Sequence, residues 1–138
     1  MKKPKYRSRM EARIVPPLLA LGARYEPIRL GFAAKPRFYI PDVILANGIV
    51  LEIKGWFTPA DRAKMLLVKA AYPDLDLRMV LASPRQTLSK TSKTTQAQWC
   101  ERNGIPWADD RIPFGWAELP PNSKSLAVIS RAPKRRVA

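Results

Sequence analysis

The sequence predicts an α/β fold in which a mixed β-sheet is flanked by helices. Two observations predict it. Segments with the alternating pattern of strands follow one another between residues 24 and 54, and strong helix signals lie before and after them. The expected order, α-β-β-β-α-β-α, places helices on the faces of a mixed sheet. A chain of 138 residues suits one such domain.

The first helix is predicted to begin after Ser8, because a serine followed three residues later by Glu11 forms a capping box. Pro16 and Pro17 conflict with a long helix, since each proline inside a helix costs roughly 3 kcal/mol. We therefore expect a short helix that ends near Ile14 and a second helical turn that restarts at the prolines.

Strands are predicted over residues 25–30, 38–45 and 49–53, and the last two flank the hairpin signal Ala46-Asn47-Gly48. A helix should begin after Thr58, with Asp61 in its first turn, and run to about residue 71. A buried strand over residues 77–82, a polar loop over 83–94 and a helix over 95–103 follow. We expect one domain over residues 1–118, opened by a basic arm of residues 1–7, and a disordered basic tail over residues 119–138.

Composition narrows the possible functions. The 25 Lys and Arg residues outweigh 11 Asp and Glu, and the resulting charge of +14 favours nucleic acid as the partner. The absence of histidine excludes His-based nucleases, Ser-His hydrolases and His-ligated metals. The single cysteine, Cys100, is expected to be a buried thiol of an intracellular protein. We expect no membrane span and no nucleotide cofactor, because long apolar runs and glycine-rich phosphate loops are lacking.

The pattern that carries chemistry is Pro41-Asp42, followed after nine residues by Glu52-Ile53-Lys54. In a strand, Glu52 and Lys54 project from the same face. Carboxylates of this kind hold Mg²⁺, and a neighbouring lysine orients or deprotonates the attacking water, or stabilises charge that develops on a phosphate.

The hairpin turn decides whether the two carboxylates share one face. A two-residue turn would pair Asp42 with Ile53 and place Asp42 opposite to the face of Glu52. A three-residue turn, with a type I turn on Ala46-Asn47 and Gly48 in the left-handed conformation, would pair Asp42 with Glu52. We predict this G1 bulge or a local twist with the same effect.

Pro-Asp followed by Glu-x-Lys after a hairpin is the pattern of the PD-(D/E)xK nuclease superfamily. Within it, the chain resembles phage endonuclease I, a family of Holliday-junction resolvases. The similarity runs in the same order and at nearly the same spacing over roughly residues 7–118. It is carried by residues 8–14, 39–45, 47–56, 61–67, 72–82, 99–109 and 113–116.

The resemblance implies a restriction-endonuclease-like fold and a homodimer whose protomers exchange a strand, with residues 29–38 as the bridge. It implies that Asp42 and Glu52 bind Mg²⁺ or Mn²⁺, that Ile53 offers its carbonyl, and that Lys54 is the catalytic lysine. By the same resemblance, Glu11 completes the metal site from the partner chain. The alternative for Glu11 is a capping role alone.

Basic side chains outside this pattern are assigned to DNA phosphates. The loop over residues 83–94 has the alternative of a solvated connector. Thr58 and Asp61 are interpreted as helix caps, and the tryptophans at 99, 107 and 116 as packing residues. The residues expected to bind DNA are Lys3, Lys5, Arg7, Arg9, Arg62, Lys64, Arg85, Lys90 and Lys93.

Together these expectations describe a Mg²⁺-dependent endonuclease that cuts DNA. The family resemblance implies that its substrates are branched DNA, chiefly four-way junctions, and that it acts in the cytoplasm of a phage-infected host cell. Two alternatives remain open. A nuclease of the same superfamily could act in repair, restriction or transposition. A non-catalytic DNA-binding protein could instead use the carboxylates in a structural ion-pair network.

Overall fold

The computed structural model describes residues 4–32, 37–110 and 114–135. Its centre is a five-stranded sheet in the order β1-β4-β5-β6-β7, and β2 and β3 form a separate two-stranded sheet. Strands β5 and β6 are parallel, as are β6 and β7, whereas the other pairs are antiparallel. The strands are β1 (Arg24–Tyr25), β2 (Leu30–Phe32), β3 (Arg37–Tyr39), β4 (Val43–Ile44), β5 (Ile49–Lys54), β6 (Asp76–Leu81) and β7 (Trp107–Ala108).

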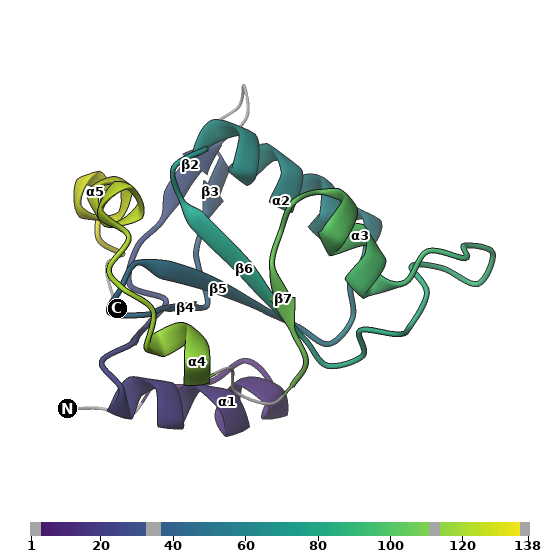
Figure 1. The fold of residues 1–138 in the computed structure, drawn as a ribbon, viewed down its shortest axis with the longest axis horizontal. Coiled ribbons are helices and arrows are strands. Elements are labelled where there is room, and N and C mark those ends of the chain that lie inside the picture. Colours follow the sequence, from purple (N-terminus) through teal and green to yellow (C-terminus); the bar gives the residue numbers. More distant parts are fainter. Residues whose placement is uncertain (1–3, 33–36, 111–113, 136–138) are drawn as a thin grey trace.

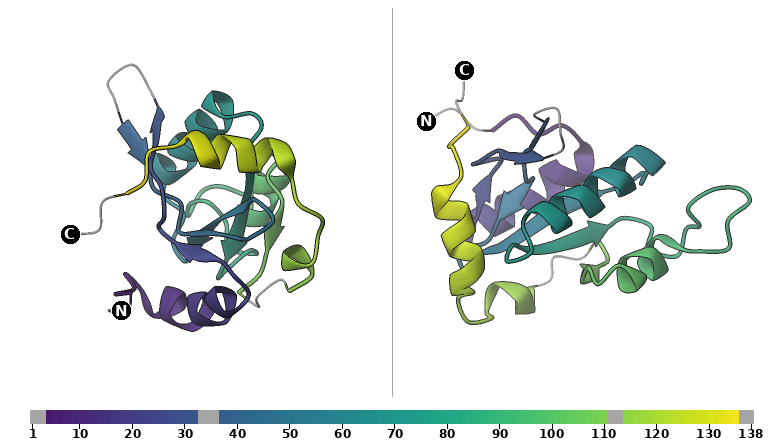
Figure 2. Two further views of the ribbon diagram at one scale, coloured as in Figure 1. Left: turned by 90° about the vertical axis from the view of Figure 1, so that its left-hand side faces the viewer. Right: turned by 90° about the horizontal axis from the view of Figure 1, so that it is seen from above.

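Helices cover both faces of the central sheet, which confirms the expected architecture. Helices α1 and α4 lie on one side, whereas α2, α3 and α5 lie towards the other (Figures 1 and 2). Each side has its own hydrophobic cluster, and β5 supplies Val50 to one and Leu51 and Ile53 to the other. The helices are α1 (Arg9–Ala20), α2 (Pro59–Ala71), α3 (Gln96–Arg102), α4 (Phe114–Ala117) and α5 (Ser123–Arg131).

Helix α1 runs straight through its two prolines, so the predicted break near residue 14 is wrong. Pro16 and Pro17 cannot donate to the carbonyls of Ala12 and Arg13, four residues earlier. All four residues lie on the exposed side of the helix, where water can solvate those carbonyls. The opposite side contributes enough apolar burial to hold the helix together, through Ile14, Val15 and Leu18.

The three-residue turn between β4 and β5 forms as predicted. The N–H of Gly48 donates to the carbonyl of Leu45 at 3.0 Å, and the N–H of Leu45 donates to the carbonyl of Ile49 at 2.8 Å. Gly48 has φ +95°, a conformation that side chains rarely adopt. These are the features of a type I turn with a G1 bulge.

This turn sets the register that the candidate site requires. Val43 lies opposite Leu51 in the antiparallel pairing of β4 with β5. The next position along each strand therefore places Asp42 opposite Glu52, on the same face of the sheet. The prediction that the two carboxylates meet across the hairpin is confirmed.

The predicted helices and strand between residues 58 and 103 form with nearly the expected boundaries. Thr58 and Thr95 cap α2 and α3 with complete capping boxes. Cys100 is buried as expected, and burial raises the pKa of its thiol to about 12. The tryptophans at 99, 107 and 116 pack against the hydrophobic clusters. Strand β7 and helix α4 were not expected, because both are short and lack a sequence period of their own.

The expectation of a disordered tail from residue 119 is wrong for the described part of it. Helix α5 begins after Asn122, whose side chain accepts a hydrogen bond from the N–H of Ser125. The hydroxyl of Ser125 donates to the carbonyl of Gly48 at 2.6 Å and accepts from the N–H of Asp76 at 3.0 Å. Ile129 is buried in the core. Helix α5 therefore packs on the turn that aligns the two carboxylates.

Residues 132–135 continue beside the start of β2. Ile28 and Lys134 form an antiparallel bridge, and the N–H of Arg29 donates to the carbonyl of Pro133 at 3.3 Å. Within the described residues, none of the helices is both long and apolar enough to cross a bilayer.

Candidate active site

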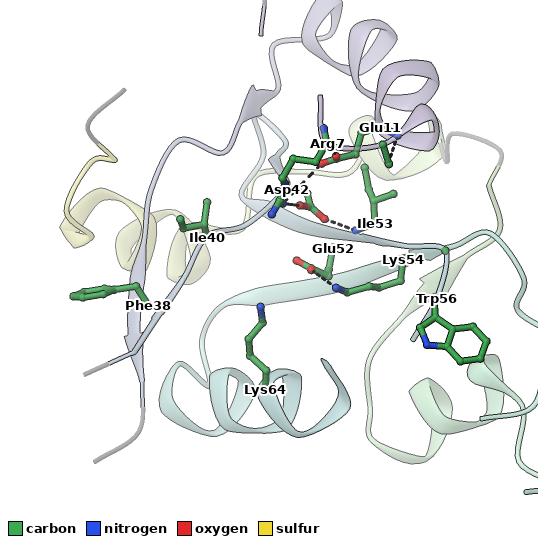
Figure 3. Close-up of a pocket in the computed structure, with 12 residues that line it drawn as sticks. Arg7, Glu11, Phe38, Ile40, Asp42, Glu52, Ile53, Lys54, Trp56 and Lys64 are labelled. Atoms are coloured by element: carbon green, nitrogen blue, oxygen red, sulfur yellow. Dashed lines mark hydrogen bonds and ion pairs between the residues drawn. The ribbon is translucent and has the colours of Figure 1, made fainter. Parts of the chain in front are cut away.

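A cavity of about 380 Å³ opens where the end of β5 meets the start of α1 and one face of α2 (Figure 3). All four side chains predicted to be catalytic line it, together with Ile53. They arrive from three places in the sequence, which the fold brings together. The lining residues are Arg7, Ser8, Glu11, Phe38, Ile40, Asp42, Glu52, Ile53, Lys54, Gly55, Trp56 and Lys64.

Asp42 and Glu52 are buried carboxylates, 3% and 4% exposed, and each is held by a defined donor. One oxygen of Asp42 accepts the backbone N–H of Ile53 at 2.7 Å. One oxygen of Glu52 accepts the hydroxyl of Tyr39, also at 2.7 Å. These contacts leave the second oxygen of each carboxylate for other partners.

The proximity of the two carboxylates has a clear electrostatic cost. Burial raises the pKa of Asp42 to about 7, and the negative charge of Glu52 adds to the rise. The pKa of Glu52 is also raised by burial, against the opposing influence of Lys54 and the Tyr39 hydroxyl. A divalent cation between such groups would relieve this repulsion.

Lys54 lies at the same end of β5, with its Nζ 3.4 Å from an oxygen of Glu52 and 3.2 Å from an oxygen of Asp61. Burial by itself would lower the pKa of Lys54, but the two carboxylates outweigh it and raise the pKa. Lys54 is therefore an ammonium group at neutral pH. Its carboxylate neighbours keep it at the edge of the cavity.

Glu11 reaches this cavity within the same chain. The N–H of Glu11 donates to the Ser8 hydroxyl at 3.1 Å, which is one half of the predicted capping box. Its carboxylate, however, accepts from the N–H of Arg7 at 2.9 Å and from the Tyr25 hydroxyl at 3.0 Å. Glu11 is only 4% exposed and does more than cap α1.

Sequence analysis missed Glu26, which forms an acidic group with Glu11 and Asp42. Oxygens of Glu11, Glu26 and Asp42 lie within 4.8 Å of one another, an arrangement able to hold a metal ion. The guanidinium of Arg7 lies among them, 2.7 Å from Asp42 and 2.9 Å from Glu26, and Arg135 also pairs with Glu26. Glu26 has φ +44°, a strained backbone that no sequence signal indicated.

The residues predicted to bind DNA lie in different surroundings. Arg7 and Lys64 line the cavity itself, whereas the guanidinium of Arg62 is engaged with the carbonyl of Phe57 at 2.8 Å. Lys3 lies outside the described residues. The side chains that are exposed outside the cavity are Lys5, Arg9, Arg85, Lys90 and Lys93.

A projecting loop and an exposed tryptophan are further candidates for contact with DNA. The loop over residues 83–94 projects from the body of the protein between β6 and α3 (Figures 1 and 2). Trp56, which sequence analysis did not single out, lines the cavity and is 64% exposed. An exposed indole next to a polar cavity is suited to stacking on a nucleobase.

Comparison with known proteins identifies the family of the chain. A family model described as phage endonuclease I matches residues 1–136. The chain is 36% identical to Endonuclease I of Escherichia phage T7 over 119 residues, which cover 83% of this chain and 80% of that protein. It is 37% identical to Endodeoxyribonuclease 1 of Enterobacteria phage T3 over 119 residues, covering 83% of this chain and 78% of that protein. The chain belongs to the phage endonuclease I family.

Proposed function

We propose that the protein is a metal-dependent endodeoxyribonuclease that resolves four-way DNA junctions by hydrolysing phosphodiester bonds at this cavity, inside the host cell. The observation that carries the proposal is the pairing of buried Asp42 with buried Glu52 across the β4–β5 hairpin, with Lys54 beside them. The names of the two relatives support an endonuclease that acts on DNA.

The donor set suits a hard cation such as Mg²⁺ or Mn²⁺, which prefers oxygen ligands. Asp42 and Glu52 would hold it with the carbonyl of Ile53, and Glu11 would complete the site, with Glu26 as a further candidate. When bound, the metal lowers the pKa of water and offsets charge on the scissile phosphate.

The chain's own residues have separate parts in this reaction. The Lys54 ammonium lies close enough to Glu52 to donate a hydrogen bond to the attacking water or to a phosphate oxygen. Arg7 and Lys64, which line the cavity, would bind neighbouring phosphates. The exposed basic side chains of the arm and the 83–94 loop would add phosphate contacts without base specificity, so that junction shape decides selectivity.

We further propose that the active protein is a homodimer whose protomers exchange a strand, as the family resemblance implies. Residues 29–38 would form the bridge between the protomers. In the single chain described, β2 pairs with β3, and Glu11 lies in the cavity of its own chain. Exchange would place Glu11 of one protomer beside Asp42 of the other. A two-fold symmetric dimer would present two sites to opposed strands of a junction.

Co-expression of two inactive variants tests this exchange. With Glu11→Ala in one chain and Lys54→Met in the other, an exchanged heterodimer contains one intact site. We expect the co-expressed pair to regain about half of the wild-type cleavage rate per heterodimer, whereas separate variants remain inactive. Failure of the co-expressed, verified heterodimer to regain any activity would show that each site is built from one chain.

End-labelled DNA tests the proposed substrate. We expect paired nicks near the branch point of a four-way junction in Mg²⁺, no nicks in Ca²⁺, and little cleavage of linear duplexes with the same arm sequences. Equal cleavage of the linear arms would indicate a nuclease with another DNA substrate. Tight binding without cleavage in Mg²⁺ and Mn²⁺ would indicate a non-catalytic DNA-binding protein.

A further inference from the structure

The acidic group at the cavity is paired with a positive charge from the same chain. The Arg7 guanidinium lies 2.7 Å from Oδ1 of Asp42 and 2.9 Å from an oxygen of Glu26 (Figure 3). An oxygen of Glu11 is 3.9 Å away. We propose that Arg7 is an internal counter-ion that occupies the acidic group until a divalent metal displaces it, and that the released guanidinium then binds a DNA phosphate. This inference rests on the proposed function of the cavity.

The contacts of Asp42 explain why Arg7 and a metal ion would exclude each other. Oδ2 of Asp42 accepts the backbone N–H of Ile53, and Oδ1 accepts from the Arg7 guanidinium, both at 2.7 Å. Oδ1 is therefore the oxygen that Asp42 could give to a metal, and Arg7 already holds it. Two positive charges on one oxygen repel each other strongly at a site with little water. Metal binding to Asp42 thus requires the guanidinium to leave.

The acidic group needs a counter-ion when no metal is bound. The side chains of Glu11, Glu26 and Asp42 are only 6%, 10% and 4% exposed, so their negative charges are poorly solvated. Burial by itself would lower the pKa of Arg7, but the three carboxylates outweigh it and raise the pKa. Arg7 is therefore firmly cationic. Its guanidinium offsets part of the negative charge that a divalent ion would otherwise neutralise.

The side chain of Arg7 can leave the acidic group without disturbing the fold. It is 64% exposed, in contrast to the carboxylates that it pairs with. Its backbone is anchored separately, because the N–H of Arg7 donates to Oε2 of Glu11 at 2.9 Å. The guanidinium can therefore swing outwards while the backbone stays beside the cavity. A phosphate at the cavity can then accept two parallel N–H bonds from it.

The same arrangement would persist if two protomers exchanged a strand. Arg7, Glu11 and Glu26 all precede residues 29–38 in the chain. An exchange across that bridge would carry the three residues together to Asp42 of the partner subunit. The competition between the guanidinium and the metal is therefore expected in either arrangement.

Release of Arg7 would couple metal binding to DNA binding. A DNA phosphate that holds the guanidinium removes the competitor of the metal and so raises the metal affinity. By thermodynamic linkage, the metal raises the affinity for DNA by the same factor. The site would then bind metal weakly in the free protein and more tightly on its substrate.

Arg7→Gln tests the competition, because it removes the positive charge and keeps a polar side chain. The matched control is Arg13→Gln, which removes the same charge from α1 at a surface pair with Asp110. In calorimetric titrations of the DNA-free protein, we expect Arg7→Gln to bind Mn²⁺ about tenfold more tightly than wild type, and Arg13→Gln within about twofold. Arg7→Lys keeps a positive charge and should bind Mn²⁺ about as weakly as the wild type.

Junction binding in Ca²⁺ tests the transfer of Arg7 to phosphate. Gel shifts with an intact four-way junction measure binding in the presence and absence of Ca²⁺. We expect Ca²⁺ to strengthen binding of wild type and Arg13→Gln by about tenfold or more, and binding of Arg7→Gln by about threefold or less. An equal effect of Ca²⁺ on Arg7→Gln and wild type would show that the released guanidinium does not bind phosphate, and the inference would be wrong.

Metal affinities separate a failure of this inference from a failure of the proposed function. If wild type binds Mn²⁺ and Arg7→Gln binds it no more tightly than Arg13→Gln does, Arg7 does not compete with the metal. The inference is then wrong, while the proposed metal site remains. If Mn²⁺ binds to neither the wild type nor Arg7→Gln, the proposed metal site of the cavity is itself wrong.

Discussion

Replacing Glu52 with alanine is expected to abolish cleavage while leaving junction binding intact. Glu52 lies inside the cavity, 4% exposed, and is the carboxylate that faces Asp42 across the hairpin. Loss of a metal ligand removes several kcal/mol of transition-state stabilisation, so we expect kcat to fall by about a thousandfold or more. Binding should persist, because it depends on exposed Lys and Arg side chains.

The comparison needs gel-shift affinity and cleavage rates measured on the same junction. Glu52→Gln is the matched variant, since its amide oxygen can still accept the Tyr39 hydroxyl that now bonds Glu52 at 2.7 Å. An Arg85→Ala variant should show the opposite pattern, with weaker binding and a kcat close to that of wild type. If Glu52→Ala lost binding and cleavage equally, Glu52 would not have the metal-binding role assigned to it.

Divalent metal binding is expected to weaken steeply below neutral pH. Burial and Glu52 raise the pKa of Asp42 to about 7, so a proton competes with the metal for this carboxylate at lower pH. We expect the Mn²⁺ affinity to fall about tenfold for each pH unit below about 7. Calorimetric titrations between about pH 5 and pH 8 measure this slope. An affinity that stays constant over this range would contradict the raised pKa.

The metal-free protein should show the reverse trend in stability. A carboxyl whose pKa is higher in the folded than in the unfolded state stabilises the fold while it is protonated. This contribution is present below about pH 4 and is lost as pH rises through about 7. The chain has no histidine, so among side chains only such perturbed groups titrate between about pH 5 and pH 8.

We therefore expect the Tm of the metal-free protein to fall by about 5 °C or more between about pH 5 and pH 8, and Mg²⁺ to reverse the fall. Scanning calorimetry of wild type and Asp42→Asn tests this expectation. The variant should show a smaller dependence of Tm on pH, since it has lost the carboxyl whose pKa lies at about 7. A flat profile for the wild type would show that Asp42 and Glu52 do not interact as the structure indicates.

The core of the site could be predicted from sequence because local rules determine it. Gly48 needs a left-handed backbone, the turn around it contains three residues, and the alternation of strands then places Asp42 beside Glu52. No contact distant in sequence is needed for that step. The capping residue Thr58 is a local signal of the same kind, and α2 begins where that residue predicts.

The parts that sequence analysis missed depend on contacts between distant residues. Helix α1 survives its two prolines because one side packs on the sheet while the proline side faces solvent. Helix α5 is held by Ser125, whose partner Gly48 lies 77 residues away. Glu26 joins the acidic group only when β1 is packed beside β4. None of these contacts has a sequence period that would indicate it.

The position of a bound metal tests the central claim most directly. In crystals of the wild-type protein grown with Mn²⁺, anomalous diffraction should place an ion about 2.2 Å from one oxygen of Asp42 and one oxygen of Glu52. The same crystals of Glu52→Ala should lack that ion. An Mn²⁺-dependent nuclease whose metal lay elsewhere, with no ion between these two carboxylates, would contradict the account.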